Sequence, residues 1–228
     1  MERFFNTAGP QKPELNYTID PLSRFDLEDI LMLIRQQRYF VMHAPRQTGK
    51  TSCMLALRDY LNNEGDYIAV YANVEGGQAG RNDRESVVRS TCDTLAQQFS
   101  GITGNDVPLR LRDEARAVET DSMLSTYLRR LSECLPKPIV LIIDEIDALV
   151  GDSLVAILRQ IRSGYADRPK AFPQSIILCG VRDVRDYRIV LSNQDIITGG
   201  SAFNIKTESL RLGNFSKEEI HELYMQHT

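Results

Sequence analysis

The sequence predicts an α/β domain that is built on a parallel sheet. Its longest uncharged apolar run, 139–143, fits a strand that is covered on both faces. Comparable runs at 39–42, 67–74 and 175–179 alternate with segments whose apolar residues recur at helical spacing. The 228 residues are enough for one large domain of this class with a well-buried core.

The elements of the first half have clear boundary signals. Asp26 is a typical N-cap, and the apolar residues that follow it at helical spacing predict a helix from 27 to about 34. After the strand at 39–42, a helical pattern begins near Cys53 and stops at 62–65, where Asn-Asn-Glu-Gly ends it. The strand at 67–74 and a glycine-rich loop at 76–81 follow.

The rest of the chain contains further amphipathic helices and three more strands. We expect helices at 85–100, 120–134 and 153–165, and strands at 138–143, 175–179 and 208–212. Residues 101–118 are weakly patterned and highly charged, so we expect them to be mobile or specific to a partner. Residues 190–206 are expected to be a loop around Gly199-Gly200. Ser216 and Glu219 form a capping box that opens a last helix.

The segment between the first strand and the helix after it predicts a phosphate-binding loop. Its sequence, APRQTGKT at 44–51, ends in Gly-Lys-Thr and has the strand–loop–helix context that such a loop requires. The loop amides and the N-terminus of the helix would both face the anion. The competing interpretation is an ordinary strand–helix turn that contains these residues by chance.

Each residue type in this loop suits a phosphate site. Gly49 lets the backbone approach the ligand, Lys50 supplies a charge to the β and γ phosphates, and the Thr51 hydroxyl is a ligand for Mg²⁺. Ala44 stands where the general pattern has glycine, and alanine is tolerated there if its φ angle is negative. The predicted nucleotide-binding residues are Ala44, Pro45, Arg46, Gln47, Thr48, Gly49, Lys50, Thr51 and Ser52.

Two adjacent carboxylates end the apolar strand at 139–143. Open α/β sheets bind ligands at the carboxyl ends of their strands, so Asp144 can serve Mg²⁺ and Glu145 can orient and deprotonate an attacking water. The alternative is a helix start, where acids complement the helix dipole. Asp147 is expected to cap or solvate the following helix.

A third chemical candidate follows the strand at 175–179. Arg182 is the cation nearest to the end of that strand, where it can sense a γ-phosphate and stabilise charge in the transition state. The competing interpretation is a solvated charged loop.

Composition limits the alternatives. The net charge of −4 gives no global indication of nucleic acid or an anionic membrane, and no apolar run is long enough to span a bilayer. The four cysteines are scattered without a zinc-type cluster, and the first residues are not a signal peptide. We therefore expect a reduced, cytoplasmic protein without a zinc site.

The chain resembles bacterial AAA-like ATPases, P-loop proteins close to the STAND and archaeal-type ATPase branches. The similar stretches are FNTAGP at 5–10, HAPRQTGKT at 43–51, LIIDEIDALVGD at 141–152, ILCGVRDVRDYRI at 177–189, GGSAFNI at 199–205 and LRLGNFSKEEI at 210–220. In that family HAPRQTGKT is the Walker A segment, with alanine at its first position, and LIIDE is the Walker B segment.

The resemblance implies a three-layer P-loop NTPase fold. Its sheet would have five parallel strands in the order 5-1-4-3-2, with helices on both faces. Arg182 corresponds to the arginine that STAND proteins carry after this strand. Adenine is preferred over guanine on resemblance alone, because no N-K-x-D motif is present. We expect an N-terminal arm at 1–25, the ATPase core at 26–215 and the first helix of a truncated lid at 216–228.

The predicted function is ATP binding with Mg²⁺-dependent hydrolysis. Lys50, Glu145 and Arg182 are the predicted catalytic residues, and Thr51 and Asp144 are the predicted metal ligands. The alternative is a nucleotide-gated switch or scaffold that binds ATP with little turnover, which the absence of a complete lid favours. A homo-oligomer, a protein partner and nucleic acid all remain open, although the charge does not indicate nucleic acid. Part of the N-terminal arm would either pack over the core or cover the adenine.

Overall fold

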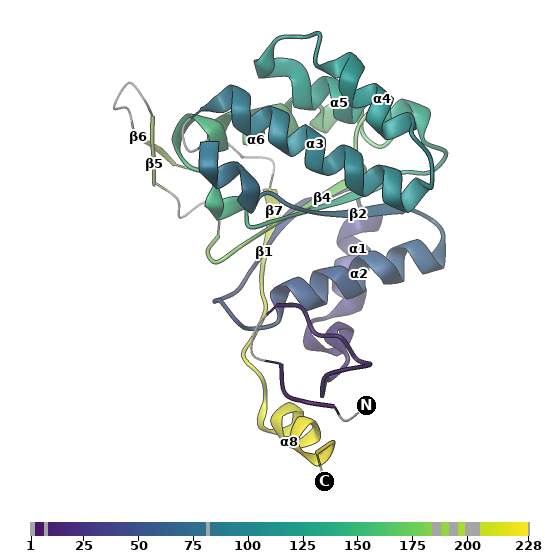
Figure 1. Ribbon diagram of the computed structural model, residues 1–228, viewed down its shortest axis with the longest axis vertical. Helices are drawn as coiled ribbons and strands as arrows, with labels where there is room; N and C mark the ends of the chain where they lie inside the picture. The colour runs from purple at the N-terminus through teal and green to yellow at the C-terminus, as the bar shows by residue number, and fades with distance from the viewer. Residues whose placement is uncertain are drawn as a thin grey trace.

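The computed structural model describes residues 3–6, 9–80, 83–183, 188–191, 196–198 and 206–227. Its centre is a five-stranded sheet in which every neighbouring pair is parallel (Figure 1). The strands are β1 (Tyr39–His43), β2 (Ile68–Asn73), β3 (Ile139–Asp144), β4 (Ser175–Gly180) and β7 (Lys206–Arg211).

The order across the sheet is β2-β3-β4-β1-β7. Read from the β7 edge, this is the order 5-1-4-3-2 of the five parallel strands, so the fold prediction is confirmed. The arrangement places β1 between β4 and β7, and β3 next to β4. The loops that follow β1, β3 and β4 therefore leave the same edge of the sheet.

Helices cover both faces of the sheet (Figure 1). One layer contains α1 (Leu27–Arg35) and α2 (Lys50–Glu64), and the other contains α3 (Arg84–Thr103), α4 (Val107–Ala115), α5 (Thr120–Cys134) and α6 (Gly151–Ser163). The residues of β3 alternate between the layers: Leu141 packs toward α3–α6, and Ile142 packs toward α1 and α2. Both faces are thus apolar, which explains the unbroken apolar run in the sequence.

Local signals explain where the helices begin and end. The Asp26 carboxylate accepts a hydrogen bond of 3.1 Å from the Asp29 amide, so it is the predicted N-cap of α1. Gly65 ends α2 in the left-handed conformation with a φ of 83°, as its position after Asn-Asn-Glu predicted. The Ser216–Glu219 capping box is also present at the start of α8 (Lys217–Met225).

Three segments differ from the sequence expectation. Residues 107–115 form α4, whose Leu111 and Ala115 are buried against the core, so the expectation of a mobile 101–118 segment is wrong there. Short strands β5 (Arg188–Val190) and β6 (Ile196–Thr198) pair in an antiparallel manner, and β6 lies within the expected loop at 190–206. The expected loop at 76–81 contains the 3-10 helix η2 (Glu75–Gly80), whereas Gly199-Gly200 lies outside the described residues.

The N-terminal segment and α8 lie together below the helices α1 and α2 (Figure 1). The Tyr17 hydroxyl is 3.0 Å from Nδ1 of His227, and the Gln226 side chain bonds both the amide and the carbonyl of Thr18. The 3-10 helix η1 (Pro21–Arg24) then leads into α1. Among the described helices, none is both long and apolar enough to cross a bilayer.

Candidate active site

The loop between β1 and α2 has the backbone of an anion site. Gln47 and Gly49 have positive φ angles of 62° and 85°, so the chain turns sharply before α2 begins at Lys50. Gly49 is the N-cap and offers no side chain to the first amides of the helix. A side chain at Gly49 would be strained by its φ angle, and the uncapped amides remain available to a ligand.

Ala44 occupies the first position of the loop without strain. Its amide donates a 3.1 Å hydrogen bond to the Gly180 carbonyl, which extends the β1–β4 ladder by one residue. Among the described residues, the non-glycine residues with positive φ are Gln37, Gln47 and Glu145, so Ala44 does not need glycine's conformational freedom. Its side chain is fully buried, and the departure from glycine is compatible with the fold.

Four predicted site residues converge at the carboxyl edge of the sheet. The Thr51 hydroxyl donates a 2.9 Å hydrogen bond to Oδ2 of Asp144, although 93 residues separate the two. Nζ of Lys50 lies 3.5 Å from Oδ1 of Asp144 and 3.8 Å from Oε1 of Glu145. The fold thus joins the loop after β1 to the end of β3, as the sequence predicted for these residues.

Glu145 is held in an unusual backbone conformation. Its φ of 58° is left-handed, which costs free energy for a residue other than glycine and turns the chain away from β3 into the 3-10 helix η3 (Ile146–Ala148). Its side chain is about 29 % exposed, whereas Asp144 is fully buried. The pKa of the Glu145 carboxyl is raised above its usual value, because the effect of burial exceeds the lowering by the nearby Lys50 ammonium.

The oxygen donors at this point suit a hard divalent cation. The Thr51 hydroxyl and the Asp144 carboxylate are the only oxygen ligands that the sequence predicted, and they lie in direct contact. Mg²⁺ takes one or two such protein ligands and keeps most of its waters or phosphate ligands. The residues that are present therefore fit Mg²⁺ bound together with a nucleotide phosphate.

Tyr71 of β2 also contacts this site and was not predicted. Its hydroxyl donates a 2.8 Å hydrogen bond to Oδ2 of Asp144. Burial and the Asp144 carboxylate both raise the pKa of Tyr71, so its phenol stays protonated at neutral pH. No local motif could have identified it, because the contact depends on the pairing of β2 with β3.

Arg24 is the second residue that the sequence did not single out. Its side chain is 3 % exposed. The guanidinium donates to the Thr48 carbonyl at 3.1 Å and to the Gly213 carbonyl at 2.7 Å. It also pairs with Glu219 at 3.1 Å and stacks 3.8 Å from the centre of the Phe215 ring. One buried cation thus joins the phosphate loop to α8 and the segment before it.

The other predicted residues are placed as follows. Pro45, Arg46 and Gln47 are exposed on the outer side of the loop, and Thr48 is buried and bonds the Pro45 carbonyl. The Ser52 hydroxyl accepts a hydrogen bond of 3.2 Å from the Gln11 amide, which brings the N-terminal segment to the start of α2.

Arg182 and Asp147 follow the ends of β4 and β3. Arg182 is exposed just after β4, and its contact with a phosphate stays a prediction. Asp147 does not cap α6, as the sequence suggested, because its Oδ2 accepts a hydrogen bond from the Val181 amide and α6 begins without a side-chain cap. Asp147 instead connects the turn after β3 to the turn after β4.

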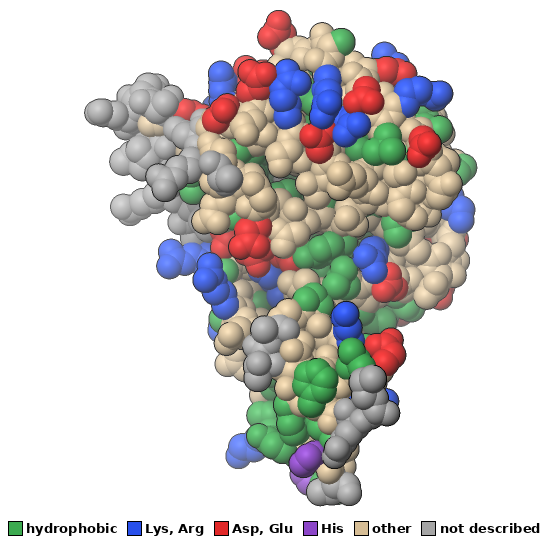
Figure 2. Space-filling model, viewed as in Figure 1, with side chains coloured by type: hydrophobic (Ala, Val, Ile, Leu, Met, Phe, Trp, Pro, Cys, Tyr) green, Lys and Arg blue, Asp and Glu red, His purple; other side chains and the backbone are tan. Residues whose placement is uncertain are grey.

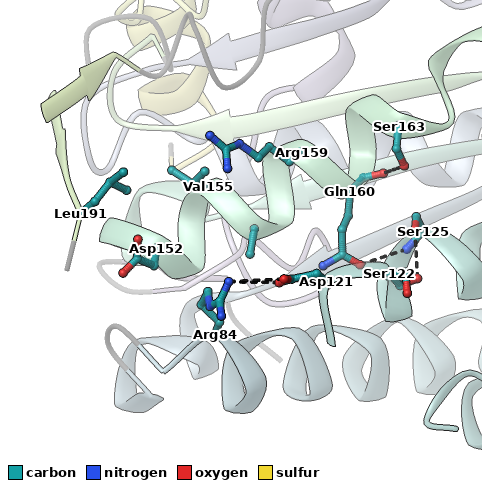
Figure 3. Close-up of a pocket in the computed structure, with 11 residues that line it drawn as sticks. Arg84, Asp121, Ser122, Ser125, Asp152, Val155, Arg159, Gln160, Ser163 and Leu191 are labelled. Carbon is teal, nitrogen blue, oxygen red and sulfur yellow. Dashed lines mark hydrogen bonds and ion pairs between the residues drawn. The ribbon is translucent and has the colours of Figure 1, made fainter. Parts of the chain in front are cut away.

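A separate cavity of about 390 Å³ lies on the α3–α6 side (Figure 3). Arg84 and Asp121 pair across it, and the Gln160 side chain is bonded to the backbone of α5. None of the predicted nucleotide residues lines it. We therefore assign the nucleotide to the carboxyl edge of the sheet and not to this cavity.

Charged side chains over the upper helices are mixed rather than segregated (Figure 2). Asp93 accepts from both Arg112 and Arg116, and Arg89 pairs with Glu85. These pairs neutralise the arginines of α3 and α4. This surface therefore does not form the uniformly basic patch that is typical of nucleic-acid binding.

Comparison with known proteins supports the assignment. The sequence model of the family described as AAA domain matches residues 34–187, which include the phosphate loop, Asp144, Glu145 and Arg182. A comparison with curated proteins found no match.

Several solved structures have a similar fold. A Walker-type ATPase of Pyrococcus abyssi has a TM-score of 0.63 at 16 % identity, over 97 % of this chain and 60 % of that one. Cdc6p of Pyrobaculum aerophilum has a TM-score of 0.54 at 20 % identity, over 90 % and 48 %. Drosophila ORC bound to DNA and Cdc6 has a TM-score of 0.53 at 9 % identity, over 88 % and 30 %. The chain spans between 30 % and 60 % of the length of these neighbours. The likeness concerns the fold.

Proposed function

Because the chain belongs to the AAA domain family of P-loop ATPases, we propose that it binds ATP and hydrolyses it with Mg²⁺. The observation that carries this proposal is the convergence of Lys50, Thr51, Asp144 and Glu145 within hydrogen-bond or ion-pair distance. A phosphate loop alone would serve many phosphate ligands. A glutamate placed next to the loop lysine favours hydrolysis over simple binding.

Each residue has a distinct role in this proposal. The loop amides and Lys50 hold the β and γ phosphates, and Lys50 exchanges its carboxylate partners for the phosphates. Thr51 and Asp144 hold Mg²⁺, which supplies charge neutralisation on the phosphate oxygens when bound. Glu145 orients the attacking water and accepts its proton. Arg182 senses the γ-phosphate from the loop after β4.

A second candidate is a nucleotide-gated switch with slow turnover. Arg24 favours it, because the same guanidinium bonds the Thr48 carbonyl of the phosphate loop and Glu219 of α8. A ligand that changes the conformation of the phosphate loop would change the position of α8 through this cation. The two candidates share the nucleotide and differ in the rate of hydrolysis.

We propose a protein partner or a second copy of the chain rather than nucleic acid. One structural neighbour is bound to DNA, but this chain has a net charge of −4, and the described arginines of α3 and α4 pair with acids. The four cysteines are free thiols, which is the state expected in a reducing compartment such as the cytoplasm.

Nucleotide binding is tested first with Lys50→Ala. Removing one charge-assisted contact to phosphate is expected to lower ATP affinity by about 10- to 100-fold. Lys137→Ala is the matched control, because Lys137 is exposed and follows α5, at the opposite end of the sheet from the loop. Calorimetry of ATP binding to the three proteins decides the point. Equal affinity in all three would refute the proposed phosphate loop.

A further inference from the structure

The Asp144 carboxylate is buried among four donors from three segments. Oδ1 accepts from the Glu145 amide at 2.9 Å and lies 3.5 Å from Nζ of Lys50. Oδ2 accepts from two hydroxyls, that of Thr51 at 2.9 Å and that of Tyr71 at 2.8 Å. Three of these donors belong to the loop or to the acidic pair itself. Tyr71 comes from a different strand and has no place in either motif.

Strand register explains how Tyr71 reaches this carboxylate. Tyr71 pairs with Ile142 and Asn73 pairs with Asp144 in the β2–β3 ladder. Side chains two apart on a strand share a face, so Tyr71 and Asp144 both point to the α2 side of the sheet. The length of the Tyr71 side chain carries its hydroxyl two residues further along β3, to Asp144. Asn73, which is directly opposite Asp144, instead accepts from the Glu75 amide at 2.7 Å.

A fully buried carboxylate depends on such donors. Asp144 has no exposed surface, so each lost donor leaves a desolvated oxygen without compensation. The hydroxyls of Thr51 and Tyr71 approach the same oxygen from α2 and from β2. Tyr71 thus gives Oδ2 a second donor from a separate element, and it helps to fix the rotation of the carboxylate together with the Glu145 amide on Oδ1.

We propose that Tyr71 is a positioning residue for the nucleotide–metal site, because its hydroxyl holds Oδ2 of Asp144 in the orientation that serves the metal ion beside Thr51. The inference rests on the proposed function. Residues that orient metal ligands usually contribute about 10- to 100-fold to metal affinity. Tyr71 acts through Asp144, so it should affect the metal much more than the nucleotide itself.

The test uses Tyr71→Phe, which removes the hydroxyl and keeps the ring. Mn²⁺ is the probe, and its affinity for the protein–ADP complex is measured by electron paramagnetic resonance. We expect Mn²⁺ affinity to fall about 10-fold. The affinity for ADP in the presence of EDTA is measured by calorimetry and should stay within about 2-fold, since this contact does not reach the nucleotide.

Tyr67→Phe is the matched control. Tyr67 directly precedes β2, at the end of the strand away from Asp144. It packs against the same apolar cluster, and its hydroxyl is 3.4 Å from Nε2 of Gln174. It should leave both affinities unchanged. Equal Mn²⁺ affinity in the parent and in Tyr71→Phe would overturn the inference. An equal loss of metal-free ADP affinity would also overturn it, because that pattern indicates a general structural role.

A double-mutant cycle gives a second and independent readout. If Tyr71 acts through Asp144, adding Tyr71→Phe to Asp144→Asn should cause no further loss of Mn²⁺ affinity. Additive losses would contradict the inference. Failure of the proposed function is recognised separately, because the parent protein itself would then bind Mn²⁺ no better with ADP than without it.

Discussion

At the scale of single residues, Arg24 lies outside the predicted motifs and yet joins three separate segments. A guanidinium can donate five hydrogens in a planar fork, and here they reach two carbonyls and one carboxylate while the ring of Phe215 covers one face. Such a buried cation is tolerated only when its donors are satisfied. Arg24 therefore stabilises the particular arrangement of the phosphate loop and α8 that the structure has.

Arg24→Ala is expected to lower the free energy of unfolding by about 2 to 3 kcal/mol, because it leaves the Thr48 and Gly213 carbonyls and Glu219 without their donor. Arg24→Lys should recover only part of this loss, since an ammonium cannot reproduce the fork. The measurement is the urea midpoint at constant slope.

Arg35→Ala is the control for charge alone. Arg35 pairs with Glu28 at 3.6 Å, and both side chains are more than half exposed. Its replacement should change stability by less than about 0.5 kcal/mol. If the two alanine variants were equally stable, Arg24 would be an ordinary surface arginine.

The sequence singled out residues that the structure brings together where each pattern was local. Lys50 and Thr51 sit in one loop, and Asp144 and Glu145 end one strand, so short patterns could identify all four. Tyr71 and Arg24 escaped because their partners come from other elements. A tyrosine in an apolar strand carries no sign in the sequence that its hydroxyl meets a carboxylate.

At the scale of elements, tight packing at the end of α6 explains why residue 164 is a glycine, although its backbone conformation does not require one. Gly164 has a φ of −93°, which any residue adopts. A Cβ atom there would lie 2.1 Å from the Phe172 ring, and Phe172 is fully buried in the α3–α6 core. The position therefore excludes a side chain for steric reasons.

Gly164→Ala is expected to lower the free energy of unfolding by about 2 to 3 kcal/mol through overpacking. Gly101→Ala tests the opposite case, because Gly101 lies within α3 and nothing occupies the space around its Cβ position. That substitution should stabilise the protein by about 0.5 to 1 kcal/mol through helix propensity. Thermal unfolding of both variants checks the signs, and a stabilised Gly164→Ala protein would contradict the packing.

Elements were predictable where their own residues carried a strong pattern. Four strands of the main sheet, β1 to β4, consist largely of buried apolar residues, and the predicted segments overlap all five observed strands. By contrast, α4 is short and carries four charged residues among its nine, and Leu111 and Ala115 gain their burial from α3 and α5. Strands β5 and β6 have three residues each, which is too short for an alternating pattern to be recognised.

At the scale of the whole molecule, sheet topology creates the site. Residues 51 and 144 meet because β1 and β3 both flank β4 and all three run in parallel. The strand order came from the family resemblance, since apolar runs predict strands without saying which ones are neighbours. The link from the N-terminal segment through Arg24 to α8 is also a property of the complete fold.

The central claim is that this arrangement hydrolyses ATP and that Glu145 activates the water. Its most direct test measures ATP turnover with Mg²⁺, together with ATP affinity, for the parent and for Glu145→Gln. Glutamine has nearly the same shape but cannot accept the proton. Glu75→Gln is the control, because Glu75 is exposed and its charge acts on Glu145 from nearby.

We expect the parent to turn over ATP, and Glu145→Gln to bind ATP within about 3-fold while its turnover falls at least about 100-fold. Glu75→Gln should keep most of the turnover. If the parent and Glu145→Gln both bound ATP and hydrolysed it at the same rate, Glu145 would not be the base. If both bound ATP and neither hydrolysed it, the hydrolase claim would be contradicted and the switch would replace it.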